Sequence, residues 1–331
     1  MVASTVVPRG GPHVRWLSKA PSRRVGPLGP PAKGTTGVGS GGRFAEAILF
    51  RSGARLITAF IALGSAVAAA AAQSAEPAIV ARIGDYVERY YGRAQSILAL
   101  ETVAIQPLRL DLTSDGFARR LVYELRVEWN PDEGDGQAMV VRELLSVNGR
   151  PSRKNDEPRC TDPRGVSPEP LATLLPARRG SYAFTQAGLG TVDGRTAVMV
   201  DYRALRPEPP KVEWRDECAS IDLPGRTRGR IWADPETAEI LRFDEHVVGL
   251  VDIPVPIAQQ RKGGSPFMTV ERADMSIQYR RTAFVDPDET LMLPAQIDSV
   301  VVVRNSGSPR LRITQTFSGY RRFVTASRIL R

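Results

Sequence analysis

The segment Phe117-Ala-Arg-Arg-Leu-Val-Tyr-Glu-Leu-Arg-Val-Glu-Trp129 decides the fold class. Large apolar side chains recur at every second position from Leu121 to Trp129, and charged side chains occupy most positions between them. This period of two predicts a strand that buries one face and exposes the other to water. Strands of that kind are typical of an antiparallel sheet that is covered on one side.

Further alternating segments follow, separated by short turns. Asn148-Gly149 and Asp193-Gly194 are strong hairpin signals, because both dipeptides accept the positive φ angles of tight turns. Asp-Pro turns at 234–237 and 286–290 separate two more pairs of strands. The strands and hairpins expected on this basis lie at 117–129, 137–147, 191–202, 228–233, 239–249, 268–284, 293–304 and 311–323.

Residues 77 to about 100 predict one amphipathic helix before the strands. Ile79, Ile83, Val87 and Tyr90 recur at steps of three and four, opposite a charged face. One helix followed by many antiparallel strands predicts a mainly β (α+β) fold, with the helix packed on a large curved antiparallel sheet that forms a half-barrel.

The stretch 56–72 predicts export from the cytosol. Arg51 and Arg55 precede this apolar stretch, and Ala70-Ala71-Ala72 ends it. A basic flank, an apolar core and a small-residue exit are typical of a secretory signal peptide. No cysteine follows in Gln73-Ser74-Ala75-Glu76, so the sequence predicts no lipoprotein anchor. We expect a signal peptide over 46–75 that is cleaved, and a periplasmic or secreted protein without a permanent membrane anchor.

The chain is expected to divide into three parts. Residues 1–45 are rich in proline and glycine, with little apolar periodicity. They are either a disordered leader or the product of an initiation site assigned too early, with the true start near Leu49; an organellar transit peptide is a further alternative. After the signal peptide, residues 76–331 are expected to form a single β-rich half-barrel domain.

The distribution of charge argues against nucleic-acid binding. The whole chain has a formal net charge of +9. Residues 1–75 hold nine basic side chains and one acidic side chain, whereas the remainder holds 36 basic and 35 acidic ones. The predicted mature domain is therefore almost neutral and lacks the basic surface that nucleic acids require.

Cys160 and Cys218 are the two cysteines of the chain. In an oxidising compartment an even number of cysteines favours a disulfide bond, which here would join the loop around Cys160 to the sheet. Two unpaired thiols are the alternative.

The sequence assigns no catalytic residue, cofactor or metal. His246 is the one histidine outside the leader, and it shares a strand face with Arg242 and Asp244. One hypothesis is a hydrolase that uses His246 and Asp244 in a triad with a serine. The chain has no Gly-x-Ser-x-Gly motif to present such a serine, and a solvent-facing histidine is the simpler interpretation. One histidine and two distant cysteines form no zinc site, and no phosphate-binding glycine loop is present.

The apolar segment 247–257 is a candidate ligand lid. Pro254 and Pro256 exclude it from a central strand, so it is expected at an edge of the sheet. It would act either as a lid over an apolar cavity or as a plug of the core. The candidate lid residues are Leu250, Val251, Ile253, Pro254, Val255, Pro256 and Ile257.

With these elements placed, most of residues 78–331 resembles the bacterial LolA-like superfamily of outer-membrane lipoprotein carriers and envelope sensors. The resemblance rests on the hairpin Gly229-Arg-Ile-Trp-Ala-Asp-Pro-Glu-Thr-Ala-Glu-Ile-Leu-Arg242, on Leu293-Pro294, and on Phe317-Ser-Gly-Tyr-Arg-Arg-Phe323. More narrowly, these motifs resemble an uncharacterised group of secreted acidobacterial proteins. The resemblance implies a half-barrel whose apolar concave face holds acyl chains.

Three functions are therefore expected, in this order. The first is a non-catalytic periplasmic protein that binds or carries a hydrophobic ligand, lipid-like or a lipoprotein acyl group, in the half-barrel. The second is an envelope scaffold or sensor module that docks a protein partner. The third is the hydrolase that uses His246.

Overall fold

The computed structural model describes residues 76–94, 96–128, 139–156, 159–163, 170–215, 218–260 and 264–322, together with the backbone of 16–19. Residues 16–19 form strand β1 (Trp16–Lys19). Apart from β1, the predicted leader lies outside the described residues, as does the whole predicted signal peptide, so the three-part division of the chain stays a prediction.

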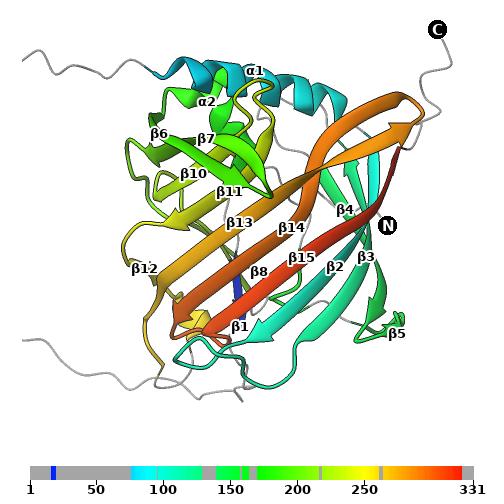
Figure 1. Ribbon diagram of the computed structural model, residues 1–331. Helices are drawn as coiled ribbons and strands as arrows, with labels where there is room; N and C mark the ends of the chain where they lie inside the picture. Colours follow the sequence, from blue (N-terminus) through cyan, green and yellow to red (C-terminus); the bar gives the residue numbers. More distant parts are fainter. Residues whose placement is uncertain are drawn as a thin grey trace, which may run out of the picture. The chain divides into compact units, whose positions relative to one another are not determined.

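One large antiparallel sheet dominates the described residues (Figure 1). Its strands are β2 (Ile97–Pro107), β3 (Arg119–Glu128), β4 (Met139–Val147), β5 (Arg150–Pro151), β6 (Tyr182–Val192), β7 (Arg195–Ala204), β10 (Thr227–Ala233), β11 (Ile240–Val247), β12 (Val251–Pro254), β13 (Phe267–Val285), β14 (Asp288–Arg304) and β15 (Arg310–Arg322). The spatial order is β5-β4-β3-β2-β15-β14-β13-β11-β10-β7-β6, with β12 paired to β13. The path ends at β5 and β6 without closing, which confirms the predicted mainly β fold with an open, half-barrel sheet.

The hairpin turns lie where the dipeptide signals predicted them. Asn148 and Gly149 have φ angles of 50° and 81°, and Asp193 and Gly194 have φ angles of 48° and 78°. Positive φ at both central residues gives the turn a twist that matches the twist of the flanking strands.

The helix is shorter than the sequence predicts. Helix α1 spans Ala78–Arg93, and Ser96, with a φ of 56°, follows its end. The prediction of a helix to about Leu100 was wrong, because Ile97 and Leu98 only by coincidence continue the helical spacing. Both residues belong to β2, whose backbone pairs with β3 on one side and β15 on the other.

Helix α1 packs on the inner face of the sheet, which is the face that all three apolar clusters share. Val80, Ile83 and Val87 are fully buried in the first cluster, with residues of β7, β10, β11, β13 and β14. The short helices η1 (Pro170–Leu174) and α2 (Pro176–Arg179) lie beside α1 (Figure 1). On its polar side, Arg82 donates hydrogen bonds to the carbonyls of Pro235, at 3.0 Å, and of Glu236.

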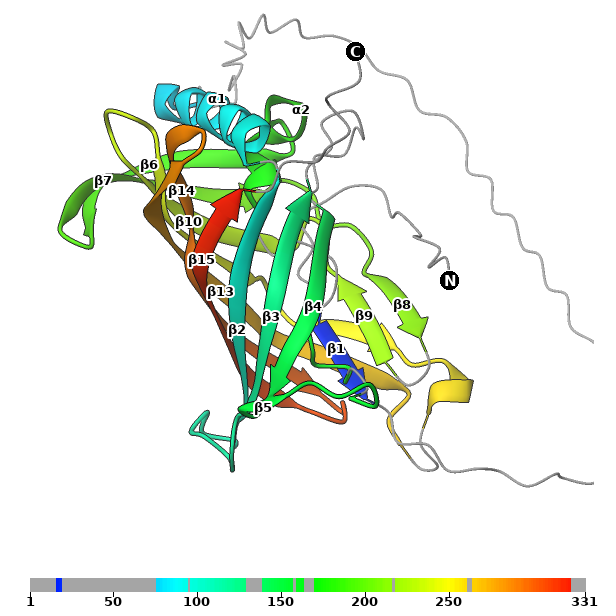
Figure 2. The same ribbon diagram turned by 90° about the vertical axis from the view of Figure 1, so that its right-hand side faces the viewer.

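A small second sheet packs on the inner face at another place (Figure 2). It has the order β1-β9-β8, with β8 at Lys211–Arg215 and β9 at Cys218–Asp222. Strands β8 and β9 were not predicted from the sequence. Ala219 and Ile221 of β9, with Leu223 after it, form the second apolar cluster with residues of β12, β13 and β14. Helix α1 and strand β9 thus cover two separate parts of the inner face.

Candidate functional site

The inner face of β2, β3, β4 and β15 holds a third apolar cluster. Its buried members are Val103, Ile105, Leu121, Tyr123, Val147 and Leu311, and the partly buried Leu144 and Ile313 pack against them. All of these side chains come from one sheet layer, whereas the first cluster includes α1 and the second includes β9. Among the described residues, no helix and no second sheet contributes an apolar side chain to the third cluster.

A buried ion pair lies beside the third cluster. Arg142 of β4 donates from Nε to Glu101 Oε2 at 2.5 Å and from Nη2 to Glu101 Oε1 at 3.2 Å. Gln315 Nε2 donates to the same Oε1 at 3.0 Å. The Glu101 side chain is fully buried, and that of Arg142 is 6% exposed. A carboxylate held by two guanidinium N–H groups and an amide has a fixed orientation.

A second ion pair continues this polar strip. Arg119 Nη2 donates to Asp162 Oδ2 at 2.8 Å, and Asp162 is almost fully buried. Burial, with the nearby charges of Asp162 and Glu101, raises the pKa of Tyr123, so this hydroxyl stays protonated. We call these residues the polar border of the third cluster: Glu101, Arg119, Tyr123, Arg142, Asp162 and Gln315. The third cluster and its border together could hold a ligand that is apolar with a polar end.

Cys160 and Cys218 form a disulfide bond, with their Cα atoms 5.3 Å apart. Cys218 begins β9, and Cys160 lies two residues before Asp162. The bond therefore joins the small second sheet to the segment that provides one end of the polar border.

The seven candidate lid residues divide between the core and the surface. The members packed in or against the second cluster are Val251, Ile253 and Val255, and the exposed members are Leu250, Pro254, Pro256 and Ile257. Strand β12 explains the division, because its side chains alternate between the two faces of the sheet. Ile257 begins the short helix η2 (Ile257–Gln259). The structure does not bring these residues next to the third cluster, and a lid role stays a prediction.

His246 lies on β11, but its surroundings are not those of a triad. Arg228 Nε donates to His246 Nε2 at 2.5 Å, and burial, with the charge of Arg228, lowers the histidine pKa. Asp244 accepts hydrogen bonds from Arg242 Nε at 2.8 Å and from Ser276 Oγ at 2.7 Å. The serine therefore bonds the aspartate, whereas a triad needs a hydrogen bond from serine to histidine.

Glu245 is a buried acid that was not predicted from the sequence, although it falls at an inward-facing position between Phe243 and Val247. It is 2% exposed, and the Tyr202 hydroxyl donates to its Oε2 at 2.6 Å. Burial raises the pKa of Glu245 to about 7, against the opposing effect of the hydrogen bond from Tyr202.

Replacing Glu245 with glutamine is expected to stabilise the protein at alkaline pH only. The pKa of Glu245 is about 7 when folded, against 4.5 ordinarily. As the pH rises from about 4.5 to about 7, Glu245 loses its proton in the unfolded state before it does so in the folded state. Deprotonation therefore favours unfolding, and the free energy of unfolding falls by about 3 kcal/mol across this range. Urea unfolding should show E245Q about 3 kcal/mol more stable than the unaltered protein at about pH 8 and equally stable at about pH 4. The same difference at both pH values would show that Glu245 does not titrate in this window.

The described ranges hold no group of three or more His, Cys, Asp or Glu side chains that could bind a metal ion. They also hold no helix that is long and apolar enough to cross a membrane.

A scan against protein-family models and a search of curated proteins found no match to this chain. Among solved structures, the chain is similar to a domain from Vibrio parahaemolyticus described as a putative outer membrane lipoprotein-sorting protein, with 9% identity, a TM-score of 0.31, and coverage of 75% of this chain and 96% of that one. It is also similar to a DUF1329 family protein from Desulfovibrio piger, with 11% identity, a TM-score of 0.34, and coverage of 74% and 92%. A third is a LolA superfamily protein from Nitrosomonas europaea, with 10% identity, a TM-score of 0.28, and coverage of 75% and 97%. These identities and TM-scores are low, so no residue role or function passes from these proteins to this chain.

Proposed function

We propose that this protein is a non-catalytic periplasmic or secreted protein that holds a hydrophobic, lipid-like ligand on the inner face of its open sheet. The observation that supports this proposal most is the third cluster, whose apolar side chains come from a single layer of the described fold. An acyl chain would supply the apolar partner layer that α1 and β9 supply elsewhere.

The polar border supports an amphipathic ligand rather than a plain hydrocarbon. Glu101 and Arg142 form a neutral, hydrogen-bonded pair at one side of the third cluster. Arg119 and Asp162 form another, in which Arg119 Nε and Asp162 Oδ1 are buried without a hydrogen-bond partner among the described residues. Buried polar groups of this kind orient ligands in sites that are otherwise apolar. The polar group of the ligand would lie at this border, with its chain against Leu144 and Ile313, the partly buried members of the third cluster.

The substitution L144W is expected to block ligand binding. Leu144 is partly buried and packs against the third cluster, so a larger side chain would occupy space that the acyl chain needs. Each buried methylene contributes about 0.8 kcal/mol, so the loss of two or three contacts should weaken binding of a fluorescent fatty acid by about tenfold or more.

The neighbouring residue provides a matched control. Leu145 is 39% exposed and does not belong to the third cluster. L145W should bind the same probe within about twofold of the unaltered protein, and near-ultraviolet circular dichroism should show both variants folded. Equal affinity of folded L144W and L145W, or no binding by the unaltered protein, would contradict the proposal.

Docking of a protein partner is the second candidate function. Strand β6 ends the sheet and pairs only with β7 among the described strands, which leaves one of its edges without a strand. Exposed edges accept strands from other chains. Crosslinking in intact cells from a photoreactive residue at Leu189, which is 66% exposed on β6, should trap a partner. Recovery of uncrosslinked chain alone would count against this candidate.

A further inference from the structure

Three connections lie at one end of the large sheet, which we call the basal end. It comprises residues 108–118 between β2 and β3, 305–309 between β14 and β15, and the described residues 255–260 and 264–266 between β12 and β13. Strand register places them side by side. Pro107 pairs with Leu311, Arg304 with Thr269, and Pro254 with Phe267, so these strands begin or end along one edge.

Large apolar side chains at the basal end face water. Leu110 is 81% exposed, Phe117 is 100% exposed and Ile257 is 87% exposed. Phe267, at the start of β13, is 46% exposed. None of these four side chains packs in the apolar core, because each lies at the end of a strand or in a connection. Exposed apolar side chains gathered in one region mark an interaction surface.

The connection that presents Leu110 and Phe117 is held by its own hydrogen bonds. Gln106 Nε2 donates to the carbonyls of Pro107, Asp115 and Gly116, at 2.9, 3.2 and 3.2 Å. The backbone N–H of Leu108 donates to the carbonyl of Arg310 at 3.1 Å, which fixes this connection to the start of β15. The two apolar side chains are therefore presented on a structured loop.

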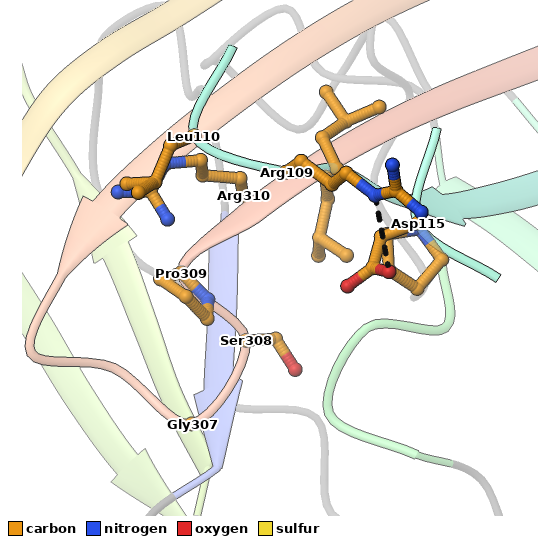
Figure 3. A pocket seen from close by; sticks show the side chains of 10 residues that line it. Arg109, Leu110, Asp115, Gly307, Ser308, Pro309 and Arg310 are labelled. Carbon is orange, nitrogen blue, oxygen red and sulfur yellow. Dashed lines mark ion pairs between the residues drawn. The ribbon is translucent and has the colours of Figure 1, made fainter. Parts of the chain in front are cut away.

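A pocket of about 590 Å³ lies between the same two connections (Figure 3). It is lined by residues 107–110, Asp115 and residues 307–311, and it includes the arginines Arg109 and Arg310. Its size is in the range of small-molecule sites. Arg109 makes a 3.7 Å ion pair with Asp115, and both side chains are at least 60% exposed, so this pair is weak. None of the described residues forms an ion pair with Arg310.

We propose that the basal end docks on a phospholipid membrane. Leu110 and Phe117 insert into the boundary between the lipid headgroups and the acyl chains. Arg109 and Arg310 bind lipid phosphodiesters at the pocket that they line. Apolar side chains flanked by arginines are the combination that holds peripheral proteins at this boundary. The nearby Asp111 accepts hydrogen bonds from the N–H and hydroxyl of Thr113, at 3.1 and 2.7 Å, which orient its carboxylate and leave its negative charge in place. The pocket shares Leu311 with the third cluster, but docking through Leu110, Phe117 and the two arginines does not depend on the ligand proposed above.

Vesicle co-sedimentation of the full chain tests the docking surface. The probe is a vesicle of phosphatidylethanolamine and phosphatidylglycerol. The double variant L110D/F117D should lower the partition coefficient by about tenfold or more, because two buried apolar side chains are lost. The matched control is L189D/V285D, which changes two side chains that are 66% and 95% exposed outside the basal end. It should bind like the unaltered chain.

A second pair of variants tests the arginines. R109Q/R310Q should lower the partition coefficient by about 30-fold, since each of the two arginines contributes about 1 kcal/mol near an anionic surface and 1.4 kcal/mol is a factor of ten. R203Q/R280Q removes the same charge from exposed positions on β7 and β13 and should have no effect. All variants retain residues 1–75, so binding through those residues is the same in every sample.

Site-specific fluorescence decides whether the basal end itself enters the bilayer. The emission that F117W adds to that of the four native tryptophans should be quenched by brominated phosphatidylglycerol, and the emission that V285W adds should not. Equal vesicle binding by L110D/F117D and L189D/V285D, or an unquenched F117W on bound protein, would overturn the proposal. If vesicles do not bind and L110D/F117D instead abolishes a dimer in analytical ultracentrifugation, the surface is a contact between copies of this chain and the proposal is wrong.

Discussion

Replacing Arg142 with methionine is expected to destabilise the folded protein by about 3–5 kcal/mol. Glu101 is fully buried, and Arg142 provides two of the three hydrogen bonds that hold its carboxylate. In R142M the Glu101 carboxylate would remain buried, and of the three hydrogen bonds the one from Gln315 would remain. Chemical unfolding at neutral pH would measure the loss of free energy.

Two controls separate this effect from the general cost of changing an arginine. Arg126 pairs with Glu124 at 3.1 Å, but its side chain is 49% exposed, so R126M should cost less than about 1 kcal/mol. The double variant E101Q/R142M should recover most of the loss, because it removes the buried charge and keeps an amide near Gln315. Equal losses in R142M and R126M would contradict the buried pair.

Removing the disulfide is expected to cost about 4 kcal/mol. Cys160 and Cys218 are 58 residues apart, and a crosslink over a loop of that length restricts the unfolded chain by this amount in the chain-entropy account. The double variant C160S/C218S should therefore unfold at a much lower denaturant concentration. Reductant should destabilise the unaltered protein by a similar amount and leave the variant unchanged. A loss below about 1 kcal/mol would mean that the bond constrains the unfolded state little.

The fold class could be predicted because its signals are local. The alternation from Leu121 to Val127 identifies a half-buried strand, and Asn148-Gly149 and Asp193-Gly194 identify their turns by φ preference alone. Strands β8 and β9 were missed because each has five residues, too short for a clear period, and because β9 is stabilised by packing on distant residues of β12, β13 and β14. Local pattern also failed at Ile97, where pairing with two strands overrides helical spacing.

The candidate site was predictable only in part. Counting cysteines was enough to suggest the bond between Cys160 and Cys218. The buried pair of Glu101 and Arg142 was not predicted, because charged residues in an alternating strand are ordinarily assigned to the solvent face. A signal existed for Glu101: it shares the parity of Ala99 and Val103, which face the core. Arg142 had no comparable signal, since a register shift in the pairing of β3 with β4 alters which face the residues of β4 occupy.

Native mass spectrometry of the unaltered protein, purified from a membrane extract, tests most directly whether the third cluster holds a lipid-like ligand, as we propose. We predict a species heavier than the chain by the mass of a lipid, which organic solvent releases as an acyl-containing molecule, and which is absent from L144W and present in L145W. Recovery of the chain at its own mass alone, both from the extract and after incubation with membrane lipids, would contradict the claim.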